Sequence, residues 1–333
     1  MTNIPFQALV VRQEDDTFVR KIETRHSDDL PAGDILVRVL YSSLNYKDAL
    51  SATGNRGVTR RYPHTPGIDA AGVVAASDLP HIRPGQEVLV SCYDLGMNTP
   101  CGFAEYIRVP AAWVVQKPAG LTCKEAMIYG TAGFTAALSV YKLMNQGVSP
   151  DQGPILVTGA TGGVGSMAVA ILAKEGFQVT AASGKAASDF LTALGAQKII
   201  SRDQVSGSLD KALLRPRWAG VIDTVGGEIL AKALKSTKYG GAVTCCGNVA
   251  SGDLPMTVYP FILRGITLLG IDAAECPLPL RQTIWDRLAS AWKLARLPEM
   301  ASEISMAQLS EHIDLLLQSR IKGRVVVKVA AGP

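Results

Sequence analysis

A run of small residues between two apolar stretches carries the clearest chemical signal in this chain. Four glycines stand in it, namely Gly159, Gly162, Gly163 and Gly165. Apolar residues from Ile155 to Thr158 precede the run, and apolar residues recur at helical spacing after it as far as Gly176. Glycines at such a strand-to-helix turn let the backbone approach a pyrophosphate, and the helix start offers free N–H groups. Although Ala160 replaces the first glycine of the G-x-G-x-x-G pattern, the run predicts a dinucleotide site.

The residues after the next predicted strand, 178–182, indicate which dinucleotide binds. NAD sites place an Asp or Glu about twenty residues beyond the glycines, where it holds the ribose 2′-hydroxyl. This chain has Ser183, Gly184 and Lys185 there, and no carboxylate. A 2′-phosphate would be repelled by an acid and held by a hydroxyl and an ammonium. The sequence therefore predicts NADPH, with a merely polar loop as the alternative.

Strands and helices alternate around this turn. Beyond it the pattern predicts helices over 188–194 and 228–238, and strands over 198–201, 220–224, 242–246 and 266–271. A long helix over 130–146 comes before it. The alternation is typical of an α/β protein with a Rossmann doubly wound parallel sheet.

The first third of the chain has a different pattern, in which short strands are separated by Pro, Gly and Asp. The candidate strands are 6–11, 34–42, 69–75, 86–90 and 104–109. Many short strands and few helices predict a compact barrel or sandwich.

The C-terminal part is predicted to leave the Rossmann sheet. Its elements are amphipathic helices near 281–296 and 306–319 and a last strand over 324–329. Because six strands already complete the Rossmann sheet, we expect the last strand to return to the first domain. The expected domains are 1–124 with 270–333, which is discontinuous, and 125–269.

Length and composition exclude several classes of protein. At 333 residues the chain is long enough for two domains, and its net charge of +4 forms no basic stripe for nucleic acid. The charge is compatible with an anionic small-molecule substrate. No apolar run approaches the roughly twenty residues of a membrane span, and the N-terminus has no signal-peptide pattern. The six cysteines lack C-x-x-C spacing and are expected as reduced thiols in the cytoplasm.

Six segments, taken together, resemble one protein superfamily. They are 42–50 (SSLNYKDAL), 66–72 (PGIDAAG), 130–136 (GTAGFTA), the glycine-rich turn, 222–226 (IDTVG) and 260–264 (PFILR). The chain resembles the medium-chain dehydrogenase/reductase superfamily in its zinc-independent quinone-oxidoreductase branch, and most of all the NADPH-dependent acryloyl-CoA reductases. The resemblance implies a GroES-like β-barrel catalytic domain, a Rossmann NADPH-binding domain, and an active site in the cleft between them.

The residue types argue against a metal. A catalytic zinc needs about three Cys, His or carboxylate ligands, and a structural zinc needs four clustered thiolates. Zinc-bearing relatives place a Cys near Asn45–Asp48 and His-Glu where this chain has Ile68 and Asp69, and isoleucine ligates no metal. The remaining candidate ligands are too scattered: Cys92, Cys101, Cys123 and the expected surface residues His64 and His81.

Without a Lewis acid, hydride transfer to an electron-poor alkene or a quinone is favoured over alcohol oxidation. The acceptor carbonyl gains negative charge in the transition state, and one or two hydrogen-bond donors can stabilise it. Tyr46 is the leading catalytic candidate, either as a donor to that oxygen or in positioning the nicotinamide, with an ordinary strand-end aromatic as the alternative. In the resembling family the tyrosine at this position contacts the cofactor. Asp48 is the second catalytic candidate, or else the N-cap of the helix that it begins.

The resemblance also implies a set of cofactor-binding residues. Those of the phosphate turn are Thr161, Gly162, Gly163 and Val164. The 2′-phosphate would be held by Ser183, Gly184, Lys185 and Arg202. Lys185 replaces an arginine frequent in the family, which keeps the charge and weakens stacking on adenine, and Arg202 could instead be a solvated charge. Near the nicotinamide half, the residues that match family positions are Asn248, Ile262 and Ala273.

The sequence therefore predicts an NADPH-dependent reductase of α,β-unsaturated carbonyl compounds, with acryloyl-CoA as the best single substrate. An NADPH:quinone oxidoreductase on the same scaffold is the first alternative, because fold does not fix substrate. A non-catalytic NADPH-binding sensor is the second alternative.

Two further features bear on partners. Arg56, Arg60 and Arg61 form a basic cluster that could steer the phosphates of an enoyl-CoA, although such clusters are more often simply solvated. The predicted strand 266–271 would lie at an edge of the Rossmann sheet, and such edges pair with symmetry mates. We expect a homodimer with a small-molecule substrate, and neither nucleic acid nor a membrane as partner.

Overall fold

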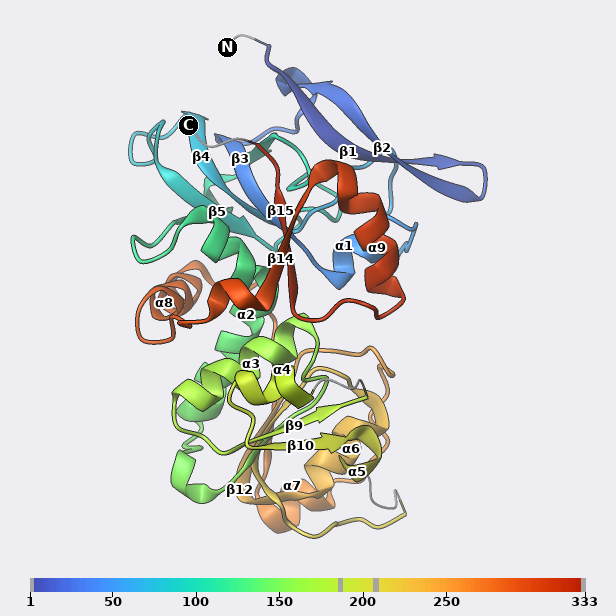
Figure 1. Cartoon of the computed structure of the whole chain (residues 1–333), viewed down its shortest axis with the longest axis vertical. Helices are drawn as coiled ribbons and strands as arrows, with labels where there is room; N and C mark the ends of the chain where they lie inside the picture. The colour runs from blue at the N-terminus through green and yellow to red at the C-terminus, as the bar shows by residue number, and fades with distance from the viewer. Residues whose placement is uncertain (1–2, 185–187, 206–209, 331–333) are drawn as a thin grey trace. The chain divides into compact units, whose positions relative to one another are not determined.

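The computed structural model describes residues 3–184, 188–205 and 210–330. By their internal contacts these residues fall into two compact units. The first unit comprises the chain up to Thr131 and again from Ala274 onward, and the second runs from Ala132 to Ala273. Figure 1 labels many of the elements of both units.

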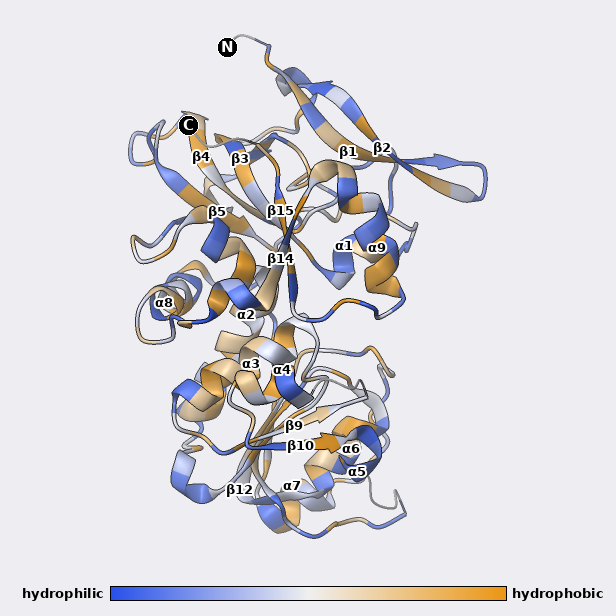
Figure 2. Ribbon diagram, viewed as in Figure 1, coloured by the Kyte–Doolittle hydropathy of each residue, from blue (hydrophilic) through white to orange (hydrophobic). Residues whose placement is uncertain are grey.

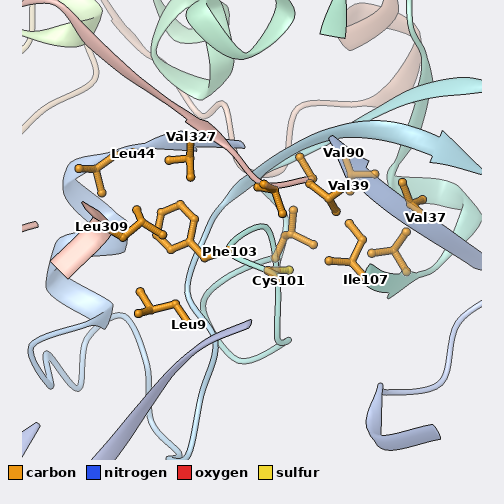
Figure 3. Packing of buried hydrophobic residues seen from close by; sticks show 14 of the residues in the cluster. Leu9, Val37, Val39, Leu44, Val90, Cys101, Phe103, Ile107, Leu309 and Val327 are labelled. Atoms are coloured by element: carbon orange, nitrogen blue, oxygen red, sulfur yellow. The ribbon is translucent and has the colours of Figure 1, made fainter. Parts of the chain in front are cut away.

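The first unit is built on a seven-stranded sheet. Its strand order is β14-β15-β3-β4-β5-β7, and β6 pairs with β3. The strands are β3 (Ile35–Leu44), β4 (Asp69–Ser77), β5 (Glu87–Ser91), β6 (Tyr106–Val109), β7 (Val114–Gln116), β14 (Ala301–Ser305) and β15 (Arg324–Lys328). A separate two-stranded sheet pairs β1 (Pro5–Glu14) with β2 (Thr17–His26). Alternate residues of these strands point inward, and Figure 3 shows side chains such as Val39, Phe103 and Ile107 in the resulting core.

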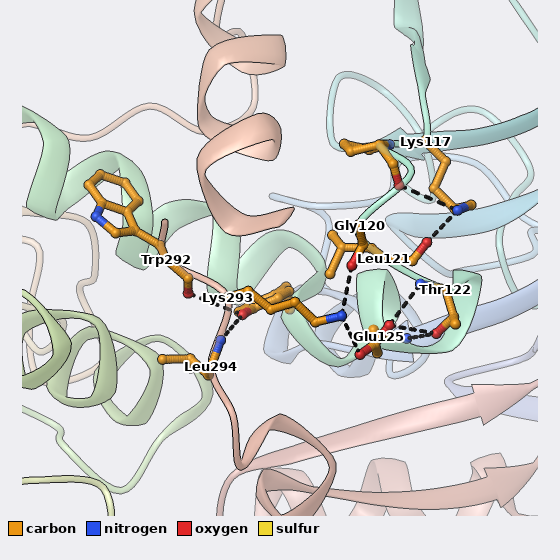
Figure 4. A network of polar contacts seen from close by, with 10 residues as sticks. Lys117, Gly120, Leu121, Thr122, Glu125, Trp292, Lys293 and Leu294 are labelled. Atoms are coloured by element: carbon orange, nitrogen blue, oxygen red, sulfur yellow. Dashed lines mark hydrogen bonds and ion pairs between the residues drawn. The ribbon is translucent and has the colours of Figure 1, made fainter. Parts of the chain in front are cut away.

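The helices of the first unit are short. They are α1 (Tyr46–Ser51), α8 (Leu278–Ala289), α9 (Leu309–Leu317) and the 3₁₀ turns η1 (Ser27–Asp29), η2 (Ala111–Trp113), η4 (Leu297–Met300) and η5 (Met306–Gln308). The first part of α2 (Cys123–Asn145) also belongs here. Figure 4 shows how the start of α2 is held: Thr122 and Glu125 cap each other, and Lys293 donates to Gly120 O at 2.7 Å and pairs with Glu125 at 2.9 Å.

The last strand returns to the first sheet, as the sequence predicts. β15 pairs antiparallel with β3, with Val325 opposite Leu44, and parallel with β14. Its run of three valines is buried, which suits a strand covered on both faces. This pairing brings Arg324 next to residues far away in the sequence, and the candidate active site depends on it.

The second unit is a doubly wound α/β fold, which confirms the predicted Rossmann sheet. Its six parallel strands have the order β10-β9-β8-β11-β12-β13. They are β8 (Ile155–Val157), β9 (Val179–Ser183), β10 (Lys198–Ser201), β11 (Trp218–Asp223), β12 (Thr237–Cys245) and β13 (Thr267–Gly270). The helical segments are α3 (Gly163–Lys174), α4 (Ser188–Ala193), α5 (Arg202–Val205), α6 (Gly227–Lys235), α7 (Tyr259–Arg264) and η3 (Pro150–Gln152). The strand order reverses between β8 and β11, where ligands bind in open α/β sheets.

Several boundaries differ from the sequence prediction. The sequence prediction lacks β2. Among the described strands β2 pairs only with β1, and it carries hydrophilic residues, coloured blue in Figure 2, at half-buried and exposed positions alike. The helix predicted over 281–296 begins earlier, after Pro277, and ends at Ala289, because Ser290 leaves the helical conformation with φ −130° and ψ −101°. None of the described helices combines the length and hydropathy that crossing a bilayer requires.

His64 is the clearest error among the predicted surface residues. Its backbone pairs with Val11 of β1, which draws the side chain into the interior, and burial lowers the pKa of the imidazole. His81 is exposed, as predicted.

Candidate active site

The glycine-rich turn leads into the start of α3. Gly162 is the N-cap, with φ −78° and ψ 172°, so the amides of Gly163, Val164 and Gly165 lie in the first helical turn. These N–H groups have no acceptor within the helix and are available to an anion. A Cβ at Gly165 would lie 2.8 Å from Cα of Ala160 and collide with the carbonyl of Gly159, so only glycine allows the helix to approach the turn so closely. The turn thus has the geometry of a dinucleotide-phosphate site.

A buried carboxylate ties together the ends of β8 and β11, the two strands between which the order reverses. Asp223 accepts hydrogen bonds from Thr158 Oγ1 at 2.7 Å and from the backbone N–H of Gly226 at 2.8 Å. Thr224 Oγ1 in turn donates to Thr158 O at 2.9 Å. Burial raises the pKa of Asp223, and these donors oppose the rise. Sequence reasoning placed Asp223 in a motif and did not recognise that it fixes this edge of the site.

The end of β9 brings together three of the residues expected to hold a 2′-phosphate. Ser183 is buried, and its Oγ lies 3.3 Å from Thr161 Oγ1. The guanidinium of Arg202 lies against Gly184 so closely that a Cβ at this position would collide with it. In the parallel register Ser201 lies opposite Ser183, which explains why Arg202, the next residue, reaches the same corner. A hydroxyl and a guanidinium fit a phosphate dianion; Lys185 lies outside the described residues.

The three remaining cofactor candidates are not gathered at this turn. Asn248 follows β12, and its Cα would lie 3.1 Å from a Cβ at Gly226. Ile262 lies on α7 with 70% of its surface exposed, and no described contact joins it to the phosphate turn. Ala273 is buried at the end of the second unit. Their role near a nicotinamide stays a prediction.

In the first unit, Tyr46 and Asp48 share the short helix α1 but differ in environment. Tyr46 is the first residue of the helix and is 47% exposed, whereas Asp48 is completely buried. The N-cap is Asn45, which corrects the expectation that Asp48 takes that position. Asp48 completes a capping box: its carboxylate accepts from the backbone N–H of Asn45 at 2.7 Å and from that of Ile68 at 2.8 Å.

Burial sets the electrostatics of Asp48. It raises the pKa of this carboxyl to about 7, the charge of Asp69 adds to the rise, and the N–H donors of Asn45 and Ile68 oppose it. Asn45 Nδ2 lies between the two acids and donates to Asp69 at 2.8 Å and to Asp48 at 3.2 Å. The segments around Asn45 and Asp69, far apart in the sequence, therefore meet here, with an amide donor between two carboxylates.

This donor set does not fit zinc. Zinc needs three or four ligands with lone pairs directed at the metal, whereas the Asn45 amide directs N–H groups toward both carboxylates. Within residues 3–184, 188–205 and 210–330, no group of three His, Cys, Asp or Glu side chains could hold a metal ion.

A six-stranded parallel sheet with a glycine-rich turn at its strand-order reversal, joined in one chain to a β-sheet domain, defines a two-domain dinucleotide-dependent oxidoreductase. Family models agree: the alcohol dehydrogenase GroES-like domain matches residues 31–119, and the zinc-binding dehydrogenase domain matches residues 163–290. The chain belongs to the medium-chain dehydrogenase/reductase superfamily, as the resemblance indicated.

Three relatives illustrate how close the similarity is. YhfP of Bacillus subtilis is 45% identical over 326 residues, which cover 97% of this chain and 99% of YhfP. The acrylyl-CoA reductase AcuI of Ruegeria pomeroyi is 40% identical over 329 residues, covering 98% and 100%. The yhdH oxidoreductase of Salmonella enterica in complex with NADP superposes with a TM-score of 0.95 at 44% identity, covering 97% and 100%. The structure of yhfP with NAD bound has the same TM-score at 45% identity, covering 98% and 99%.

Proposed function

We propose that this chain is an NADPH-dependent reductase of conjugated carbonyl compounds, and that acryloyl-CoA is its substrate. The observation that carries the proposal is the corner formed by Ser183, Gly184 and Arg202, which offers a hydroxyl and a cation where an NAD site has a carboxylate. The full-length similarity to a relative named acrylyl-CoA reductase supports the substrate. The NADP complex of the Salmonella relative supports the cofactor.

In this proposal each residue of the candidate active site has a defined role. NADPH, when bound, supplies the hydride that adds to the β-carbon of the substrate. The amides of Gly163, Val164 and Gly165 bind its pyrophosphate, and Arg202 with Ser183 binds its 2′-phosphate. Tyr46, 47% of whose surface is exposed, donates a hydrogen bond from its hydroxyl to the thioester carbonyl as negative charge develops there. The α-carbon then takes a proton from water or from Tyr46, which yields propanoyl-CoA. Asp48, a buried residue of α1, holds the start of this helix through its bonds to the N–H groups of Asn45 and Ile68.

A substitution at Ser183 tests the cofactor preference directly. The test is informative because the crystal structure of the relative yhfP contains NAD, whereas that of the Salmonella relative contains NADP. Ser183→Asp places a carboxylate at the end of β9. We expect it to weaken NADPH by about a hundredfold, because a charge-assisted contact worth ~1.5–3 kcal/mol is lost and repulsion is added. NADH should be affected much less. A variant with the wild-type ratio of the two affinities would show that the 2′-phosphate binds elsewhere.

Turnover across a panel of acceptors distinguishes the candidate activities. NADPH oxidation is followed by absorbance with acryloyl-CoA, crotonoyl-CoA and several quinones. Rapid turnover of acryloyl-CoA is the expected result. A preference for quinones would instead indicate an NADPH:quinone oxidoreductase. The name of the relative YhfP includes the term quinone oxidoreductase. Tight NADPH binding without turnover of any acceptor would favour the sensor.

The three arginines of the basic cluster, Arg56, Arg60 and Arg61, differ in how many contacts they make. Arg56 is engaged, since its guanidinium donates to Arg60 O at 2.6 Å and to Gln13 Oε1 at 2.5 Å and lies 5.5 Å from the ring centroid of Tyr62. Arg60 and Arg61 are exposed. We propose that the latter two contact the phosphates of coenzyme A, while Arg56 shapes the loop that carries them.

For assembly, we propose a homodimer that pairs at β13. This strand is the last in the sheet order and is bonded to β12 alone among the described strands. The neighbouring helix α7 exposes Ile262 and Leu263, 70% and 56% of whose surfaces are accessible, which is unusual for such large apolar side chains. Leu263→Asp should convert a dimer into monomers in light scattering, whereas Ile22→Asp on β2 of the other unit should not.

We also propose a cytoplasmic location. All six cysteines are free thiols, and four of them are buried, which suits a reducing compartment. Cell fractionation tests this assignment, and recovery with a membrane or secreted fraction would contradict it.

A further inference from the structure

A buried carboxylate of the first unit, passed over by sequence reasoning, gathers several hydrogen-bond donors. Asp69 is the first residue of β4 and is completely buried. It accepts hydrogen bonds from Ser43 Oγ at 2.5 Å, Asn45 Nδ2 at 2.8 Å, Thr131 Oγ1 at 2.7 Å and Thr131 N at 2.9 Å. A buried carboxylate is costly unless its oxygens are bonded, and here both are. The donors come from two segments, so Asp69 joins the end of β3 to α2.

A buried cation completes this cluster without touching the acid directly. Arg324 of β15 donates from Nη2 to Ser43 Oγ at 2.9 Å and from Nε to Ile128 O at 3.1 Å. Ser43 therefore accepts from Arg324 and donates to Asp69. Burial lowers the pKa of Arg324, and the charges of Asp69 and Asp48 oppose this shift. The chain Arg324–Ser43–Asp69 has one possible direction of donation, because a guanidinium cannot accept and a carboxylate cannot donate.

The backbone of α2 is shaped to reach this cluster. Gly130 interrupts the helix with φ 49° and ψ −158°, which removes the N–H of Thr131 from the regular helical pattern and turns it toward Asp69. A Cβ at Gly130 would lie 2.5 Å from Ser43 Oγ and 2.7 Å from Asp69 Oδ2. Only glycine satisfies both the left-handed φ and this close approach. The helix gives up its regular conformation at Gly130, and the N–H of Thr131 bonds Asp69 instead. This interruption indicates that the contact to Asp69 is important for the structure of the cluster.

The cluster is connected to Tyr46 through one residue. Asn45 is the N-cap of α1 and immediately precedes Tyr46, and its side-chain amide is held by Asp69. Rotation of the Asn45 side chain or backbone would change the direction in which the first turn of α1 presents Tyr46. Two buried acids hold this residue: Asp48 bonds its backbone N–H, and Asp69 bonds its amide.

We propose that Asp69 is a positioning residue for the reaction, which orients the hydroxyl of Tyr46 by fixing Asn45 against Ser43, Thr131 and Arg324. The inference rests on the role of Tyr46 under the proposed function. Asp69 touches neither substrate nor cofactor in this proposal, so its effect passes entirely through the tyrosine.

A double-mutant cycle tests the connection. Asp69→Asn, Tyr46→Phe and the double variant are compared by kcat and KM for acryloyl-CoA. A displaced reacting group costs up to about a hundredfold, so we expect Asp69→Asn to lower kcat by roughly ten- to a hundredfold with a small change in the KM for NADPH. In the Tyr46→Phe background the same substitution should change kcat by less than about threefold, because there is no hydroxyl left to orient.

Further variants separate orientation from stability. Asn45→Ser keeps a good N-cap but removes the amide that bonds Asp69, so it should reproduce the loss of kcat even if Asp69→Asn folds poorly. Val37→Ala, in the core of the same unit, should lower the melting temperature and leave kcat unchanged.

The possible outcomes are distinct. If Tyr46→Phe lowers kcat and Asp69→Asn causes an equal further loss in that background, Asp69 does not act through Tyr46 and the inference is overturned while the role of Tyr46 stands. If Tyr46→Phe has the kcat of the wild type, the proposed function of Tyr46 fails, and the inference fails with it. Wild-type kcat in both Asn45→Ser and Asp69→Asn would overturn the inference alone.

Discussion

The guanidinium of Arg202 lies against the backbone of Gly184 so closely that a side chain at position 184 would displace it. The two residues come from the ends of neighbouring parallel strands, β9 and β10, and meet beside the buried hydroxyl of Ser183. A cation is therefore held where the second strand of the Rossmann unit ends. This is the position at which NAD sites carry an acid.

Removing this cation should change cofactor selectivity. Arg202→Ala is expected to raise the KM for NADPH by about ten- to a hundredfold, because a charge-assisted hydrogen bond contributes ~1.5–3 kcal/mol. The KM for NADH should change by less than about twofold. Steady-state kinetics with both cofactors provides the measurement. Arg217→Ala is the matched control, since Arg217 lies in the same unit but packs on the ring of Trp218 at 4.4 Å. A parallel loss for NADPH and NADH would assign Arg202 to general stability.

The close approach of α3 to the glycine-rich turn should not tolerate a methyl group at Gly165. Gly165→Ala would push a Cβ against the carbonyl of Gly159, so α3 must move away and binding of NADPH and NADH should both weaken by at least about tenfold. Gly252→Ala is the control, because this glycine lies in the same unit outside the turn and an added Cβ would meet nothing within 4 Å. Fluorescence titration with each cofactor measures the effect. Equal affinities of the two variants would contradict the assignment of the turn.

The elements that sequence reasoning located well are those with strong local signals. The strand predicted over 198–201 coincides with β10, because a short apolar run follows a helix-ending glycine. The capping box of α1 could also have been recognised, since Asn45 and Asp48 have the spacing of an N-cap and its N3 partner. Of the two roles that the sequence leaves open for Asp48, catalytic group or N-cap, the second is wrong, because Asn45 takes the N-cap three residues earlier.

The cluster around Asp69 could not be predicted in the same way. Its members Ser43, Thr131 and Arg324 meet only because β15 pairs with β3 and α2 breaks at Gly130. No periodicity in the sequence reports such long-range contacts. The one local hint is Asp69 itself, a charged residue that opens an otherwise small and apolar strand. Such a residue is buried only when partners from elsewhere compensate its charge.

Deprotonation of Asp48 should make the first unit less stable as the pH rises. The folded-state pKa is about 7, against a usual value of 3.8, so the native protein holds a proton that the unfolded chain releases. The stabilisation is therefore complete below about pH 4 and is lost as the pH rises to about 7, at ~1.4 kcal/mol for each unit of pKa shift. Asp48→Asn removes this titration.

A comparison of the wild type with Asp48→Asn isolates the effect of this one carboxyl group on stability. Thermal unfolding between about pH 4 and pH 7 should show a melting temperature that falls more steeply in the wild type than in Asp48→Asn. Asp223, whose pKa is also raised by burial, remains in both proteins and contributes equally. Parallel profiles would mean that Asp48 is ionised throughout this range, with its charge compensated by Asn45 and Ile68.

The exposed arginines should distinguish a coenzyme A thioester from a small acceptor. The double substitution Arg60→Ala, Arg61→Ala is expected to raise the KM for acryloyl-CoA by about tenfold, since each lost phosphate contact contributes ~1 kcal/mol or less at an exposed site. The KM for a small quinone, which has no phosphate, should stay within about twofold. Raising the ionic strength should reduce the difference between variant and wild type, because exposed charges are screened.

Arg56→Ala should lower the melting temperature through the lost contacts to Gln13 and Tyr62. Equal changes in KM for both acceptors would rule out a coenzyme A contact at Arg60 and Arg61.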